Sequence, residues 1–153
     1  MIDRIPLEKR QSVIKTQPCF AALKDQEIEM LATLLVPKEF KAGETIVNEG
    51  DPVDSFYLLV SGEAEVKKIT YKDKIPEEKI VAKLTADHHD AIGLNETGFY
   101  SLSGLRTATV VALTDVVALH LTLALFHGFA LYYSHVNEVM REQSRSYINM
   151  RRV

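Results

Sequence analysis

The feature that most constrains the fold of this chain is the long segment 40–121, where short β-prone runs alternate with glycine turns. The runs are rich in Val, Ile, Thr, Phe and Tyr, which favour strands, and Gly43, Gly50 and Gly62 punctuate the first half. Many short strands separated by turns favour a sandwich, barrel or jelly roll. We expect strands at 45–47, 56–60, 64–69, 79–84, 108–113 and 116–121, and a charged hairpin loop at 71–78.

Helical patterns flank this segment on both sides. Before it, Asp25 can cap a helix that Pro37 ends, and four apolar residues repeat at helical spacing: Ile28, Leu31, Ala32 and Leu35. After it, 123–133 is typical of a buried helix and 136–150 of an amphipathic one. The predicted fold is mainly β with flanking helices. We expect one domain of 153 residues, with N-terminal helices at 1–39, a β-roll or jelly roll at 40–121 and C-terminal helices at 122–153.

Charge and cysteine content exclude several classes of function. A net charge of −3 and a pI near 6.0 argue against a nucleic-acid-binding domain, which usually carries a basic excess. The single cysteine, Cys19, cannot form an internal disulfide, and the N-terminus lacks the apolar core of a signal peptide. A reducing compartment, the cytoplasm, is therefore expected.

One apolar stretch, 116–133, could be interpreted as a membrane-spanning helix. It is marginal in length for a spanning helix and contains His120, His127 and Gly128. We therefore expect a buried strand followed by a buried helix, with both histidines in the core, and no membrane partner.

The segment 90–111 carries residues from which a binding site can be built. It joins two β-prone runs but is rich in Gly, Ser and Thr, and glycine-bearing loops offer backbone N–H groups to anions. Arg106 adds a fixed fork of donors for a phosphate, and Glu96 can accept hydrogen bonds from a sugar hydroxyl. Taken alone, these residues favour a polar surface loop with an exposed arginine over a binding site.

A longer pattern resembles a known family. Residues 42–66, AGETIVNEGDPVDSFYLLVSGEAEV, closely resemble the opening strands of the cyclic nucleotide-binding domain, found in bacterial catabolite activator proteins, protein kinase A regulatory subunits and cyclic nucleotide-gated channels. The run RTATV at 106–110 resembles the end of the family's phosphate-binding cassette, here about 90–110. The likeness covers roughly residues 15–140 and implies a β-roll that binds cAMP or cGMP.

The resemblance leaves two alignments open at the start of the cassette. The family carries a Phe-Gly-Glu triplet whose glutamate binds the ribose 2′-hydroxyl. Ile92-Gly93-Leu94 matches its first two positions but places leucine at the third. A shift of two residues makes Asn95-Glu96 the Gly-Glu pair, with asparagine tolerated where a left-handed residue is needed. We favour this second alignment because it separates Glu96 from Arg106 as in the bacterial activators.

The resemblance also implies a role for each residue of the site. Arg106 would pair with the cyclic phosphate, helped by the Thr107 hydroxyl, and Glu96 would accept from the ribose. Backbone amides of the segment that includes Thr97 and Gly98 would assist, with Gly98 in a short cassette helix. Tyr147 is a candidate lid over the base, and the alternative is a tyrosine that packs a helix or a dimer contact.

One other cluster, DHHD at 87–90, suggests metal or acid–base chemistry. Adjacent residues on an extended chain point to opposite sides, so His88 and His89 do not readily share a metal. A jelly-roll metalloenzyme is thus a minor alternative, and we expect no metal, no cofactor and no catalysis.

The predicted function is a regulatory sensor, not an enzyme, that binds cAMP or cGMP and rearranges its C-terminal helix. The main alternative is a relative without ligand that serves as a protein-interaction module. The residues after the β-rich segment are too few for a helix-turn-helix, so the expected partner is an effector protein or a missing domain of a longer chain. An apolar stripe on the last helix allows a weak homodimer: Val136, Met140, Tyr147 and Met150.

Overall fold

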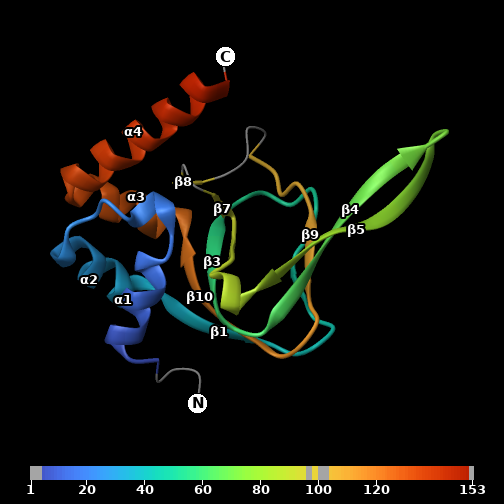
Figure 1. Cartoon of the computed structure of the whole chain (residues 1–153), viewed down its shortest axis with the longest axis horizontal. Helices are drawn as coiled ribbons and strands as arrows, with labels where there is room; N and C mark the ends of the chain where they lie inside the picture. The colour runs from blue at the N-terminus through green and yellow to red at the C-terminus, as the bar shows by residue number, and fades with distance from the viewer. Residues whose placement is uncertain (1–4, 96–97, 100–103, 152–153) are drawn as a thin grey trace.

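The computed structural model describes residues 5–95, 98–99 and 104–151, with side chains described for 5–94 and 104–142. Strands form a roll, and the N-terminal and C-terminal helices gather on the same side of it (Figure 1). A long hairpin projects from the opposite side (Figure 1). The predicted fold class, mainly β with flanking helices, is confirmed.

Two four-stranded antiparallel sheets form the roll. The first has the order β1 (Val36–Phe40), β10 (Val116–Thr122), β3 (Ser55–Ser61) and β6 (Ala91–Ile92). The second has the order β2 (Thr45–Val47), β9 (Thr109–Ala112), β4 (Glu63–Lys72) and β5 (Ile75–Thr85). A separate pair joins β7 (Leu94–Asn95) to β8 (Gly98–Phe99).

The helices lie before and after the strands in sequence. The N-terminal group is α1 (Leu7–Lys15), the 3₁₀ turn η2 (Pro18–Phe20) and α2 (Asp25–Leu34). The C-terminal group is α3 (Leu123–Tyr132) and α4 (Ser134–Arg151), and a short turn, η3 (Ala86–His88), follows β5. Asp25 is the first helical residue rather than the cap, because the Lys24 N–H that precedes the helix donates to the Glu27 carboxylate at 2.7 Å.

Side-chain alternation along β3 divides the core into two clusters. Phe56 and Leu58 face the helices, where they pack with Phe20, and Tyr57 and Leu59 face the interior of the roll. Successive strand residues point to opposite faces, so one strand serves both clusters. The helices therefore pack against the outer surface of the first sheet, and the second cluster fills the interior of the roll.

Two boundaries differ from the sequence-based expectation. Residues 36–40 form β1 rather than the end of a helical region, because they pair with β10 along their whole length. Pro37 is tolerated there since β1 is an edge strand. The expected loop at 71–78 is mostly strand: β4 and β5 pair up to Lys72–Ile75, and Asp73 and Lys74 alone turn, both with positive φ.

The apolar stretch 116–133 is only partly buried. Val116, Leu119 and Leu121 are fully buried in β10, and Phe126 and Phe129 are buried in α3. However, Leu131 and Tyr132 are 79% and 81% exposed, and His127 is exposed, so the expectation of a buried helix with a core histidine there is wrong. His120 is half-buried against the Tyr57 ring.

Two further expectations concern a membrane-spanning helix and the single cysteine. Among the described residues, none of the helices combines the length and apolar character needed to cross a bilayer. Cys19 is a buried free thiol, and burial raises its pKa to about 12. It is therefore a packed, unreactive side chain, as expected.

Candidate functional site

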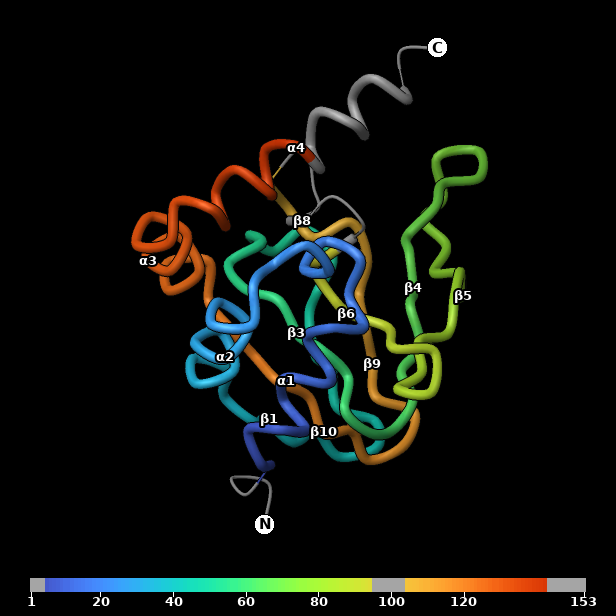
Figure 2. The backbone as a smooth tube through the Cα atoms, turned by 60° about the vertical axis from the view of Figure 1, so that its left-hand side comes forward, coloured from blue at the N-terminus to red at the C-terminus, as the bar shows by residue number. Residues whose placement is uncertain are grey.

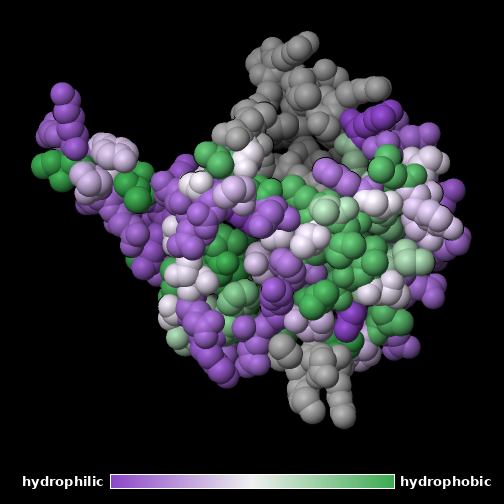
Figure 3. Space-filling model, turned by 180° about the vertical axis from the view of Figure 1, so that it is seen from behind, coloured by the Kyte–Doolittle hydropathy of each residue, from purple (hydrophilic) through white to green (hydrophobic). Residues whose placement is uncertain are grey.

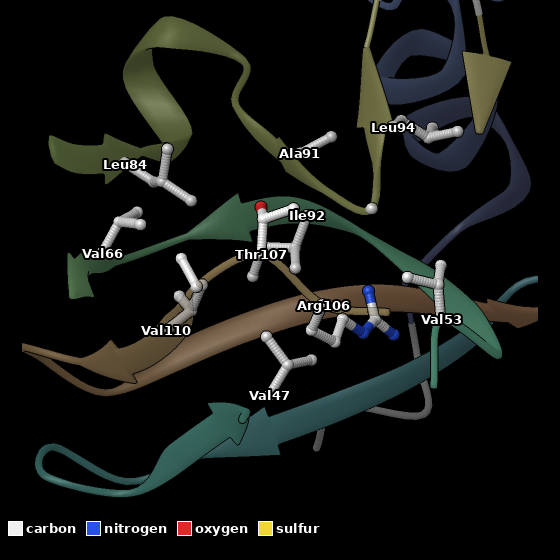
Figure 4. Close-up of a pocket in the computed structure, with 12 residues that line it drawn as sticks. Val47, Val53, Val66, Leu84, Ala91, Ile92, Leu94, Arg106, Thr107 and Val110 are labelled. Carbon is white, nitrogen blue, oxygen red and sulfur yellow. The ribbon is translucent and has the colours of Figure 1, made fainter. Parts of the chain in front are cut away.

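A cavity of about 200 Å³ is bounded by both four-stranded sheets and by the segment that leads into β9 (Figure 4). Most of its lining is aliphatic, and Arg106 supplies its one charged side chain among the described residues. Figure 4 shows the guanidinium beside Val53, at the opposite end of the cavity from Val66 and Leu84. The site therefore has a cationic end and an apolar end. Its described lining residues are Val47, Val53, Val66, Leu84, Ala91, Ile92, Gly93, Leu94, Arg106, Thr107, Ala108 and Val110.

Backbone hydrogen bonds hold Arg106 in place against the turn that follows β2. The Arg106 N–H donates to the Asp51 carbonyl at 2.7 Å, and the Gly50 N–H donates to the Arg106 carbonyl at 2.9 Å. The Val53 N–H donates to the Gly104 carbonyl at 2.9 Å. Two segments far apart in sequence thus fix the backbone from which the guanidinium projects.

One nitrogen of the guanidinium is occupied by the protein itself. Nη2 donates to the Ser55 carbonyl at 2.9 Å and to the Ser55 hydroxyl at 3.2 Å. Asp54 Oδ1 lies 3.5 Å from the same nitrogen, but the Asp54 side chain is 82% exposed, so this ion pair contributes little. Ser55 therefore orients the guanidinium more firmly than Asp54 does.

The other terminal nitrogen has no partner. Arg106 as a whole is only 8% exposed, and its Nη1 is shielded from solvent. Nη1 makes no hydrogen bond with the described residues. A buried donor of a charged group that lacks an acceptor costs free energy. This nitrogen can recover that cost by binding an anionic oxygen, and it is the strongest single indication of a ligand site in the described part of the chain.

Gly93 makes room for this arrangement. A Cβ added there would lie 2.9 Å from Arg106 Nη1 and 2.9 Å from the Ser55 carbonyl oxygen. The φ of Gly93 is +85°, in the left-handed region that favours glycine. A side chain at position 93 would thus both strain the backbone and displace the guanidinium.

The predicted site residues fall into three groups. Arg106 and Thr107 line the cavity. Asn95 and Gly98 pair with each other across β7 and β8, while Glu96 and Thr97 lie outside the described residues. Gly98 is thus in a strand rather than the expected short helix, because the backbone groups of 94–95 pair with those of 98–99. Position 147 lies in α4, but its side chain is outside the described part.

The C-terminal helix lies close to this part of the molecule. α4 contacts β8, and both views show it passing on that side of the roll (Figures 1 and 2). Val136 is fully buried and Met140 packs against the helical core cluster. The described part of the stripe predicted for a homodimer is therefore used within the chain. In addition, His135 Nδ1 on α4 lies 2.8 Å from the buried carboxylate of Glu27 on α2.

The histidine–aspartate cluster does not form a metal site in the described residues. His88 and His89 are exposed, and Asp90 Oδ2 accepts the Thr85 N–H at 2.8 Å, which closes the turn after β5. Among the described residues, no three His, Cys, Asp or Glu side chains lie together in a group that could hold a metal ion.

Sequence reasoning missed the residues that prepare the cavity. No role in the site was expected for Ser55, which orients the guanidinium and precedes the strand predicted at 56–60. The four residues of the aliphatic end were expected only as parts of strands: Val47, Val66, Leu84 and Val110. The sequence signal for these four aliphatic residues was the apolar pattern of several strands. However, the packing of the two sheets decides which face of a strand bounds a cavity.

Comparisons with known proteins agree on one family. The family model for the cyclic nucleotide-binding domain matches residues 37–133. A cAMP-dependent protein kinase regulatory subunit from Aspergillus fumigatus is 32% identical over 136 residues, which cover 89% of this chain and 30% of the relative. The chain thus spans less than a third of the length of the kinase regulatory subunits that it matches.

Solved structures show the same fold. The N-terminal domain of a transcriptional regulator from Streptomyces coelicolor A3(2) superposes with a TM-score of 0.76 at 26% identity, covering 92% of each chain. The regulatory domain of Toxoplasma gondii protein kinase A, crystallised with cAMP, gives a TM-score of 0.67 at 20% identity, over 80% of this chain and 44% of that chain.

Proposed function

The chain belongs to the cyclic nucleotide-binding domain family, and from this premise we propose that its cavity binds a cyclic nucleotide through Arg106. The observation that carries the proposal is the buried, unpartnered Nη1 at the cationic end of the cavity. A cyclic phosphate bears a single negative charge and two free oxygens, which suits one arginine that has one free donor nitrogen. Ser55 keeps the guanidinium in this orientation before any ligand arrives.

The finer assignment follows the cassette. The phosphate would contact Arg106 Nη1 and the Thr107 hydroxyl, since both residues line the cavity. Backbone amides near Thr97 and Gly98 would add hydrogen bonds, and Glu96 would accept from the ribose. The position of Gly93 against Nη1 supports instead the alignment in which Gly93-Leu94 begins the cassette. The two alignments make opposite predictions for Glu96→Ala, which weakens binding only if Asn95-Glu96 is the Gly-Glu pair.

The size of the cavity bears on where the base would lie. At about 200 Å³ it is smaller than the 300–1,000 Å³ of typical ligand pockets. The cationic end would then hold the phosphate and sugar, and the base would extend toward the side on which α4 passes. Tyr147 on α4 is the candidate lid, and movement of α4 is the proposed output to an effector protein or a further domain.

The relatives suggest which ligand to test first. The matched regulatory subunits are named for cAMP-dependent kinases, and the Toxoplasma gondii domain was crystallised with cAMP. We therefore favour cAMP over cGMP, and a regulatory rather than a catalytic role. A cytoplasmic location, with Cys19 reduced, is part of the same proposal.

A second candidate function is a protein-interaction module that has lost its ligand. The observation in its favour is that, within the described lining, no carboxylate or amide side chain faces the cavity, and Leu94 lies where the first alignment expects the ribose-binding glutamate. Such a chain would keep the fold and Arg106 without binding a nucleotide.

Calorimetric titration of the purified chain separates the two candidates. We expect micromolar or tighter binding of cAMP or cGMP and no binding of 5′-AMP, whose phosphate carries a second charge and lacks the ring. Absence of heat and of thermal stabilisation with millimolar cyclic nucleotide would contradict the sensor and leave the interaction module.

A further inference from the structure

A polar contact joins the N-terminal helices to the C-terminal helix. Glu27 on α2 is only 3% exposed, although it lies among helices that pack through apolar side chains. Its Oε1 atom accepts the Lys24 N–H at 2.7 Å and lies 2.8 Å from Nδ1 of His135 on α4. Because Oε1 already acts as an acceptor, Nδ1 carries the hydrogen and donates it. One buried oxygen atom therefore ties the start of α4 to the start of α2.

The described part of α4 is attached to the rest of the chain near its N-terminal end. Val136 is fully buried in the cluster that also contains Ile28 of α2. Among the described side chains of α4, His135 is the one that forms a hydrogen bond with another element. Seen from behind, hydrophilic side chains surround an apolar area on the helical side of the molecule (Figure 3). The exposed residues of the described part of α4 are hydrophilic as well: Ser134, Glu138, Arg141 and Glu142.

The backbone leaves the helical conformation just before this contact. Tyr133 separates α3 from α4 with φ −106° and ψ 93°, which is an extended conformation. A residue at the end of a helix can absorb the dihedral change of a hinge. The direction of α4 therefore depends on side-chain contacts near its start, and the Glu27–His135 contact lies two residues after the break.

We propose that the Glu27–His135 contact is a latch that holds α4 in the described position and opposes its movement when a ligand binds. The inference rests on the proposed function, in which movement of α4 is the output. When α4 turns about Tyr133, His135 leaves Glu27, and the buried carboxylate keeps only the Lys24 N–H. A buried carboxylate that loses a donor is destabilised, so the latched position is favoured. Ligand binding must then supply the free energy that releases the helix.

The latch can be separated from a structural role of Glu27. The hydrogen bond from the Lys24 N–H caps α2 and involves no residue of α4. A substitution at His135 therefore opens the latch and leaves the cap in place. His135→Phe removes the donor and keeps a ring of similar size. His135→Asn is the conservative variant, because its amide can place an N–H close to the position of Nδ1.

Hydrogen exchange of the whole chain tests whether the contact holds α4. A helix released from its tertiary contacts is only marginally stable, so its amides exchange faster. We expect the amides of 136–142 to exchange at least about tenfold faster in His135→Phe, whereas those of β3 and β10 are unchanged and show that the variant is folded. His135→Asn should exchange nearly as the wild type does. The matched control is His127→Phe, since His127 is exposed on α3. Unchanged exchange of α4 in His135→Phe overturns the latch.

Glu27→Gln is a second variant in case His135→Phe does not fold. Its amide oxygen still accepts both N–H groups, but a neutral acceptor binds them more weakly than a carboxylate does. The exchange of α4 should therefore accelerate in the same direction by a smaller factor. Exchange that is equal to or slower than that of the wild type would contradict the latch.

Calorimetric titration with cAMP tests whether the latch opposes ligand binding. We expect His135→Phe to bind at least about threefold more tightly than the wild type, and His135→Asn and His127→Phe to bind as the wild type does. A substitution that only destabilised the fold would leave the affinity unchanged or lower it. Either of those results, together with faster exchange of α4, overturns the proposed opposition to binding. Absence of cAMP binding in the wild type and in every variant contradicts the proposed function instead, and the exchange of α4 still decides whether the contact is a latch.

Discussion

Two regions of this molecule depart from ordinary protein surfaces in opposite ways. At the cavity, a charged donor, Arg106 Nη1, is buried without an acceptor among the described residues. On the outer face of α3, the apolar side chains of Leu125, Leu131 and Tyr132 are exposed without a cover within the described chain. The first departure concerns one directional group, so it selects a ligand by charge and geometry. The second is broad and non-directional, so it selects a surface by shape. The comparison separates a small-ligand site from an exposed apolar surface within one domain.

The largest expected effect is at the cavity. Arg106→Ala removes the free donor and should weaken cyclic nucleotide binding by about 2–5 kcal/mol, at least about thirtyfold in affinity. The double variant Leu131→Glu, Tyr132→Glu, on the outer face of α3, should leave nucleotide affinity unchanged, because neither residue lines the cavity. Calorimetric titration of both variants measures the two affinities. If the α3 variant also loses nucleotide affinity, the two regions are coupled and their separation is wrong.

A smaller effect is expected from the residue that makes room for the guanidinium. Gly93→Ala and Gly43→Ala both place a side chain at positive φ, but only position 93 has atoms within 4 Å of the new Cβ. Denaturant unfolding should therefore show a greater loss of stability for Gly93→Ala, by about 1–3 kcal/mol, the usual cost of overpacking. Its nucleotide affinity should also fall, whereas that of Gly43→Ala should not. Equal losses would show that Nη1 is not confined by Gly93.

The smallest expected effect is a change in folding stability with pH, through His120, whose pKa depends in part on the charge of Arg106. Burial, helped by the nearby charges of Lys38 and Arg106, lowers the pKa of His120 below its ordinary value of 6.5, while Asp54 opposes the shift. As the pH falls below 6.5, the unfolded chain therefore binds a proton before the folded chain does, and stability falls with pH over that window.

Nucleotide binding should act on the same group. An anion beside Arg106 offsets its positive charge, so we expect the pKa of His120 to rise when cAMP binds. NMR titration of the imidazole with and without cAMP measures this shift, and His120→Phe should remove its contribution to the pH dependence of unfolding. An unchanged or lower His120 pKa in the complex would indicate that the anion binds away from Arg106.

Local sequence signals were sufficient for much of the fold. The runs that form β2, β3 and β10 were predicted because they are rich in β-prone residues, and glycine turns separate the first two. The likeness to the family was visible in 42–66. Arg106 was predicted to be a phosphate ligand from its position at the end of a glycine-bearing loop, and it does line the cavity. These features depend on neighbours in the sequence.

The errors concern features that depend on distant residues. Residues 36–40 become a strand only because β10 lies beside them, and 71–78 extend the hairpin only because two residues suffice for the turn. The exposure of Leu131 and the free Nη1 of Arg106 depend on which surfaces the rest of the chain covers. No local pattern carries that information, and the free Nη1 is the feature from which binding is inferred.

The crystal structure of the chain with cAMP tests the central claim most directly. We expect a phosphate oxygen within hydrogen-bonding distance of Arg106 Nη1, with Nη2 still bound to Ser55 and the cavity lined as described. A nucleotide bound elsewhere, or a phosphate in the cavity that leaves Nη1 without an acceptor, would contradict the account.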